Sequence, residues 1–113
     1  MIKRISTPFS YSSAVAVGDC VFLGLHRGFG KSFTEQIHNT FSHLKETLNQ
    51  LDVSLDKLVK VNVYLKYIKD LPEMEQVFYE YFEKDKFPAR MTSTTEFIDS
   101  DCLMMIDGIA YKG

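Results

Sequence analysis

The last apolar stretch of the chain, Cys102–Tyr111, places the strongest constraint on its fold. Nearly every residue in it is apolar, and only Asp107 and Gly108 interrupt the run. In an extended strand the apolar residues fall on both faces, with Leu103, Met105, Ile109 and Tyr111 on one and Cys102, Met104, Ile106 and Ala110 on the other. Strands with this pattern are buried on both sides. The fold must therefore cover both faces of the sheet that contains this strand.

Two amphipathic helices can supply one of these covers. The first begins at a capping box of Ser32 and Glu35. The second begins with Asp70 as its cap, and Pro72 and Glu73 follow in its first turn. Apolar residues then recur at intervals of three and four, as Phe33, Ile37, Phe41, Leu44, Leu48 and Leu51 in the first helix and as Met74, Val77, Phe78, Tyr81 and Phe82 in the second. We interpret these stripes as core.

Strand patterns account for most of the remaining chain. We expect strands over Met1–Ile5, Ser12–Val17, Cys20–Leu25, Val59–Tyr67, Met91–Phe97 and Cys102–Tyr111. Within the fourth strand, the valines and Leu65 should face the core, whereas Lys60, Asn62, Tyr64 and Lys66 should face the other way. The order β-β-β-α-β-α-β-β predicts one domain over residues 1–113. Its class is α+β, a two-layer sandwich with two helices on one face of a mixed sheet.

A monomer of this design would leave one face of the last strand uncovered. A chain of 113 residues buries about two-thirds of its unfolded surface, which is enough for one core. Because both helices lie on the same side, the second face would remain as a large exposed apolar patch. The sequence therefore predicts a partner, and the alternative is a poorly soluble monomer.

The segment Phe87–Arg90 is the strongest candidate for a functional site. Pro88 cannot continue the preceding helix, so the chain should enter a strand with Arg90 near its first residue. A guanidinium beside an apolar wall requires a planar anion. That anion is either a protein carboxylate, from Asp107, Glu96 or a neighbouring subunit, or the carboxylate of a ligand in a pocket.

Charge, hydropathy and cysteine content argue against a nucleic-acid partner, a membrane span and a secreted protein. The net charge is −2 with the signs interspersed, so the basic field typical of nucleic-acid binding is missing, which weakens a ribonuclease reading. The longest apolar run is far shorter than a membrane span. Cys20 and Cys102 occur without a secretory leader, so we expect reduced thiols in a cytoplasmic protein, with a disulfide between them as the minor alternative.

No metal or cofactor is expected. His38 and His43 are five residues apart and cannot form the i,i+4 pair that binds a metal on a helix. The loop His26–Lys31 has two glycines without the spacing of a phosphate-binding fingerprint.

Four segments together resemble the RidA (YjgF-like) enamine/imine deaminase family. They are Tyr11 before Ala14–Gly18, Val59–Lys66 before a helix, Phe87–Arg90 before the last two strands, and Ile106–Ala110 near the end. The resemblance covers essentially the whole chain and implies a chorismate mutase-like fold that assembles as a homotrimer. It also implies hydrolysis of small 2-enamino or 2-imino acids to 2-keto acids and ammonia, without a cofactor, in clefts between subunits.

The resemblance assigns roles to residues of this chain. Arg90 would bind the carboxylate of the ligand, and Tyr11 would cover the ligand unless it is an ordinary half-buried tyrosine. Gly24 would leave room for the ligand. A serine often found beside that glycine in the family is absent here, so His26 or Arg27 would have to reach into the cleft.

This sequence differs most clearly from the family at the position of the residue that activates water. Met105, counted without gaps from Arg90, occupies the position of a common glutamate, and a methionine cannot activate water. Asp107 lies on the same strand face, about 7 Å farther along, and is either a displaced water-holder or a structural acceptor. Two functions stay open: a deaminase with an altered substrate range, or a catalytically weak or inactive carboxylate-binding sensor or interaction protein.

Overall fold

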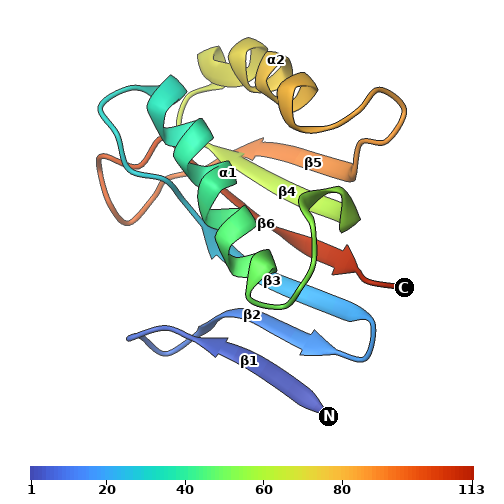
Figure 1. Cartoon of the computed structure of the whole chain (residues 1–113). Coiled ribbons are helices and arrows are strands. Elements are labelled where there is room, and N and C mark those ends of the chain that lie inside the picture. Colours follow the sequence, from blue (N-terminus) through green and yellow to red (C-terminus); the bar gives the residue numbers. More distant parts are fainter.

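Six strands form one mixed sheet, and two helices lie on one of its faces (Figure 1). The computed structural model describes residues 1–113. The strands are β1 (Ile2–Ser6), β2 (Ser12–Val17), β3 (Cys20–His26), β4 (Leu58–Leu65), β5 (Ala89–Thr94) and β6 (Met104–Tyr111), and the helices are α1 (Phe33–Asn49) and α2 (Leu71–Tyr81). Short 3₁₀ turns at Leu55–Lys57 and Ile68–Asp70 precede β4 and α2. The predicted fold class and element order are confirmed.

The last strand lies inside the sheet and not at its edge. The strand order is β1-β2-β3-β6-β4-β5, and every neighbouring pair is antiparallel except β4 and β5. The parallel pair is joined by the crossover through α2, as parallel strands require. β6 therefore has strands on both sides, whereas β1 and β5 form the two edges.

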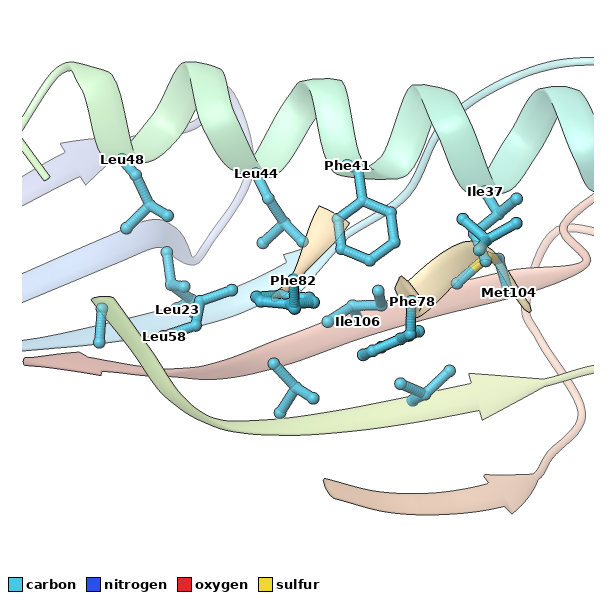
Figure 2. Packing of buried hydrophobic residues seen from close by; sticks show 14 of the residues in the cluster. Leu23, Ile37, Phe41, Leu44, Leu48, Leu58, Phe78, Phe82, Met104 and Ile106 are labelled. Carbon is cyan, nitrogen blue, oxygen red and sulfur yellow. The ribbon is translucent and has the colours of Figure 1, made fainter. Parts of the chain in front are cut away.

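The core lies between the helices and the sheet. Figure 2 shows four apolar side chains of α1 pointing from one side of the helix toward the strands: Ile37, Phe41, Leu44 and Leu48. All members of the predicted stripe of α1 are buried, and in α2 and just beyond it Met74, Val77, Phe78 and Phe82 are buried while Tyr81 is half-buried. The two helices meet where the Phe41 ring stacks on Tyr81, with 4.1 Å between ring centroids.

Neither helix covers the opposite face of the sheet, which we call the open face (Figure 1). Apolar side chains that point to it include Val17, Phe22, Met91, Met105, Ile109 and Tyr111. Phe22 is 46% exposed and Met91 is 64% exposed, although both lie within strands. The second apolar face predicted from β6 is therefore present, and the chain alone does not bury it.

The starts of the two helices differ from the prediction. The Ser32 hydroxyl accepts a hydrogen bond from the backbone N–H of Glu35 at 3.1 Å, as expected. The Glu35 carboxylate, however, accepts from the backbone N–H of Lys31, one residue earlier than in a capping box. Asp70 is the N-cap residue of α2, as predicted, but its side chain makes no capping hydrogen bond. The reason is that the 3₁₀ turn ending at Asp70 continues directly into α2 and leaves this residue in a helical conformation.

One valine of β4 is turned away from the core. The register of β4 against β6 shifts between Leu58 and Lys60, which is a β-bulge. Leu58 is buried, whereas Val59 is 49% exposed. The prediction that every valine of this strand faces the core is therefore wrong for Val59, although Val61 and Val63 are buried.

Both cysteines are free thiols. Cys102 precedes β6, is fully buried and donates to the Met104 carbonyl, and burial raises the pKa of its thiol. Cys20 is half-buried at the start of β3. No helix of the structure has the length and apolar character needed to cross a bilayer.

Candidate functional site

Arg90 lies at the start of the edge strand β5, beneath α2. Because it is paired with Val61 of β4, its side chain points to the helix-covered face. The guanidinium Nη2 donates to the Glu75 carboxylate on α2, and the group lies 5.1 Å from the centroid of the Phe78 ring. The side chain is 27% exposed. The position at a strand start is confirmed.

The protein carboxylate that pairs with Arg90 was not among those expected. Asp107 cannot reach it, because Asp107 points to the open face from β6 and β4 separates β6 from β5. Glu75 takes this place since Glu75 and Phe78 of α2 lie against the Arg90 guanidinium. A hollow of about 280 Å³ lies beside the pair, lined by Glu75, Phe78, Tyr79, Phe87, Pro88 and Arg90. The apolar wall beside Arg90 is thus aromatic and comes from α2 and the segment after it, not from the last strand.

Tyr11 and Met105 meet in a different and larger pocket, which we call the Tyr11 pocket. Its volume is about 770 Å³. It lies among the β1–β2 connection, the end of β3, α1 and the loop between β5 and β6, and its lining includes Tyr11, Leu25, Arg27, Phe29, Ile98 and Met105. Tyr11 is 43% exposed at this pocket and stacks with Phe9, with 6.2 Å between ring centroids. Both residues therefore line the same pocket.

Asp107 is held by two donors on the open face. The Asn62 amide donates to Oδ1 at 2.8 Å, and the Tyr64 hydroxyl donates to Oδ2 at 3.1 Å. Burial, followed by the bond to Asp107, raises the pKa of Tyr64, which keeps this hydroxyl in its donor form. Asn62 and Tyr64 come from the polar positions predicted on β4, but their pairing with Asp107 depends on β6 lying beside β4. This network was not anticipated.

Gly24 does not line either pocket. A Cβ at this position would lie 3.0 Å from the Ser12 carbonyl oxygen, so the close approach of β2 is what requires glycine here. The Gly24 carbonyl instead accepts a hydrogen bond from His26. Within one chain, the space beside Gly24 is occupied by backbone.

His26 points into the core, so the idea that it reaches a cleft is wrong. A register shift between Leu23 and His26 turns the side chain inward. Its Nδ1–H donates to the Gly24 carbonyl at 2.9 Å, and its Nε2 accepts from the Thr47 hydroxyl at 2.9 Å. The side chain is fully buried. Burial is the main reason that the pKa of His26 is lowered from 6.5 to about 4, so the imidazole is neutral at pH 7.

The structure thus separates the predicted site residues into two groups. Arg90 lies on the edge strand β5, whereas Met105 lies on β6, beyond β4, and Tyr11 directly precedes β2 near the other edge of the sheet. Arg90 also faces the helices, while Met105 and Asp107 face the other way. One copy of the chain therefore cannot bring Arg90 to the other candidates. No cluster of three or more His, Cys, Asp or Glu side chains is placed to bind a metal ion.

Comparison with known proteins places the sequence among relatives over nearly its full length. The family model described as Endoribonuclease L-PSP matches residues 1–112. A RutC family protein of Pyrococcus abyssi is 33% identical over 110 residues, which cover 90% of this chain and 86% of the relative. A 2-iminobutanoate/2-iminopropanoate deaminase of Dermatophagoides farinae is 27% identical over 121 residues, which cover 95% of this chain and 94% of that protein.

Solved structures show the same fold. A member of the YjgF protein family from Neisseria meningitidis has a TM-score of 0.93 at 21% identity, with 100% of this chain and 96% of that chain covered. At this identity the likeness concerns the arrangement of helices and strands, and it agrees with the architecture in Figure 1.

Proposed function

The chain belongs to the Endoribonuclease L-PSP family, to which the YjgF, RutC and RidA proteins belong, and on this premise we propose that it hydrolyses small 2-imino and 2-enamino acids. The products are a 2-keto acid and ammonia. One relative bears the name of an iminoacid deaminase, which supports this choice of reaction. The net charge of −2 argues against nucleic acid as the substrate despite the description of the family model.

The observation that carries the proposal is the position of Arg90. It lies on the edge strand β5 beside an aromatic hollow, and several of its N–H donors are not used by Glu75. A guanidinium has five N–H donors, and Glu75 occupies only Nη2. The other side of the planar fork can still bind a carboxylate in two parallel hydrogen bonds. A small 2-imino acid carries such a carboxylate directly beside its reactive carbon.

A second copy of the chain would complete the site. Since Arg90 lies on the edge strand β5 and faces the helices, it cannot reach Met105 and Asp107 of the same chain. The proposal therefore places each active site in a cleft between Arg90 of one subunit and Tyr11, Met105 and Asp107 of another. The open face gives such copies an apolar surface to bury. A homotrimer with three clefts is therefore part of the proposal.

The trimer can be tested by its mass. Light scattering at micromolar concentration is expected to give three times the chain mass of 13.0 kDa, because folded monomers would expose the open face to water. A folded species of 13.0 kDa would be a monomer and would contradict the proposed cleft between subunits.

In the cleft, the protein orients the imino acid and holds a water molecule. Arg90 fixes the carboxylate, and the oxygen of the water adds to the imine carbon. A proton passes to the nitrogen, the C–N bond breaks, and ammonia leaves as the C=O bond forms. Asp107 is the acceptor available for the water, and the hydrogen bonds from Asn62 and Tyr64 fix the orientation of its carboxylate. Its role in the proposal is to position the water.

Ammonia release tests the function directly. Imines freshly made by an amino-acid oxidase should lose ammonia faster with the purified protein than without it. The acceleration should be small, because orientation is present while a strong general base is missing. Binding of 2-keto acids without any acceleration would favour a sensor or interaction protein that uses the same cleft.

Met105→Glu should raise the rate of deamination about 10²-fold, at the lower end of what a placed acid or base contributes. Met105 is half-buried and lies two residues from Asp107 on the same face. Burial and the neighbouring charge would raise the pKa of the new carboxyl toward the range useful for a base. Asp107→Asn is the matched variant and should lower the residual rate about tenfold. If Met105→Glu changes nothing while Asp107→Asn abolishes activity, Asp107 alone activates water.

A cytoplasmic location belongs to the same proposal. Free thiols at Cys20 and Cys102 suit a reducing compartment. Localisation of a tagged full-length chain by fractionation tests this part independently of the chemistry.

A further inference from the structure

Tyr64 lies directly beside Met105, the position at which a group that activates water is missing. The two residues are partners on the antiparallel strands β4 and β6, and both point to the open face. Side chains of such a pair have their Cβ atoms about 5 Å apart. Met105 lines the Tyr11 pocket, and the half-buried Tyr64 follows on the next strand of the sheet. A phenol hydroxyl is therefore present beside the proposed cleft.

The side chain of Tyr64 connects this position to Asp107. Asp107 lies two residues after Met105 on β6, which is about 7 Å farther along the strand. Tyr64 leaves β4 opposite Met105, and its hydroxyl reaches diagonally to Asp107 Oδ2 at 3.1 Å. A water molecule bound to Tyr64 is thus linked to the carboxylate without having to contact it.

The direction of the hydrogen bonds leaves the Tyr64 oxygen free to accept a proton. A phenol has one proton and two acceptor lone pairs. Tyr64 donates its proton to Asp107, and no protein group donates to its oxygen. Asn62 donates to the other carboxylate oxygen of Asp107 at 2.8 Å, which fixes the far end of the chain of hydrogen bonds. Burial, followed by the bond to Asp107, raises the pKa of Tyr64, so the hydroxyl passes a proton on and does not act as a phenolate.

We infer that Tyr64 contacts the attacking water and relays its proton to Asp107. The inference rests on the proposed deamination and refines it, because Asp107 then positions the water through Tyr64. As the water oxygen bonds to the imine carbon, a water proton passes to the Tyr64 oxygen while the Tyr64 proton passes to Asp107. The electron pair of the C=N bond moves to nitrogen.

The same path returns the proton. Asp107 gives it back to Tyr64, and Tyr64 gives its own proton to the nitrogen, which completes the carbinolamine. The C–N bond then breaks while the remaining hydroxyl passes its proton to the nitrogen and becomes the C=O group. Ammonia leaves, and both side chains are again in their starting protonation states.

The competing explanation is that Tyr64 only braces Asp107 within the sheet. In that case Tyr64→Phe leaves Asp107 held by Asn62 and still able to bind water directly. The turnover number would then change little, and the number of protons that move in the chemical step would stay the same. A relay predicts a change in both.

Two reactions in the full-length protein test the relay. The first is ammonia release from imines freshly made by an amino-acid oxidase, and the second is exchange of the carbonyl oxygen of pyruvate with water labelled with heavy oxygen. Addition of water to the pyruvate carbonyl needs the same proton transfers as addition to an imine. Tyr64→Phe should lower kcat for both reactions about tenfold, the loss also expected for Asp107→Asn. KM and the affinity for pyruvate should not change, because Arg90 is intact.

A double variant and a matched control separate the relay from a general loss of structure. Tyr64→Phe with Asp107→Asn should lower kcat about tenfold and not about a hundredfold, because residues that act as one unit are not additive. Tyr111→Phe removes a hydroxyl from the same face, at the end of β6, and should leave kcat unchanged. Unchanged kcat in Tyr64→Phe, or a loss of about a hundredfold in the double variant, would overturn the inference.

Mixtures of H2O and D2O count the protons directly. In wild type, kcat should depend on the D2O fraction along a curve, because two protons move together, whereas in Tyr64→Phe the dependence should be linear. If Tyr64→Phe does not assemble like wild type, the wild-type measurement decides, and a straight line refutes the relay. Oxygen exchange that depends on Tyr64 without ammonia release supports the relay and removes the deamination. Ammonia release that does not depend on Tyr64 does the reverse, and acceleration of neither reaction overturns both.

Discussion

Arg90→Ala is expected to reduce the affinity for a small 2-keto acid such as pyruvate by about 2–5 kcal/mol, the usual cost of removing one partner from a desolvated charge pair. Each 1.4 kcal/mol is about a tenfold change in the dissociation constant, so calorimetry would show a loss of about 30-fold or more. Deamination should fall in parallel, because the imine can no longer be oriented.

Two further variants separate ligand binding from structure. Arg90→Lys should rescue little, because an ammonium cannot reproduce the planar fork. Glu75→Gln should strengthen binding slightly, since the carboxylate that now occupies Nη2 is removed. Circular dichroism should show all three proteins folded, because the Arg90–Glu75 pair is partly exposed and contributes at most about 1 kcal/mol. Equal keto-acid affinity in wild type and Arg90→Ala would refute the assignment of Arg90.

Lowering the pH from about 6.5 to about 4 should reduce the free energy of unfolding by about 3 kcal/mol through His26 alone. The folded protein keeps this imidazole neutral, whereas in the unfolded chain it takes up a proton near its ordinary pKa of 6.5. In this window the unfolded state binds more protons, so stability falls as the pH falls. The stability that neutral His26 contributes is fully present above pH 6.5. Below about pH 4 His26 is protonated in both the folded and the unfolded state, so no further stability is lost.

Urea unfolding at several pH values between 7 and 4 measures this loss, and His26→Gln identifies its source. The variant should be less stable at pH 7, because the bonds to Gly24 and Thr47 are disturbed. Its stability should nevertheless change less with pH than that of wild type, since the histidine that titrates is gone. Parallel curves for the two proteins would show that His26 does not control the acid sensitivity.

The sequence alone determined the elements and their buried sides. The spacing of Ile37, Phe41, Leu44 and Leu48 is sufficient to predict which side of α1 is buried, because helical periodicity is a local property of the chain (Figure 2). Pro88 similarly marks the start of the strand that carries Arg90, but the prediction that the helix continues up to this proline is wrong, because α2 already ends at Tyr81. The two apolar faces of the last strand could be predicted from alternation alone.

The tertiary structure decided which of these side chains meet. Alternation along a strand does not reveal its neighbours, and only the placement of β6 between β3 and β4 brings Asp107 to Asn62 and Tyr64 and separates it from Arg90. The bulge that turns His26 inward shifts the pairing of β3 with β6 by one residue. The hydrophobic pattern of the sequence does not indicate such a shift. Arg27 appeared in the sequence as one residue of a glycine-containing loop that could reach into a cleft. Its burial at the edge of a pocket depends on α1, the β1–β2 connection and the β5–β6 loop closing around it, and contacts between segments so distant in sequence have no local signal.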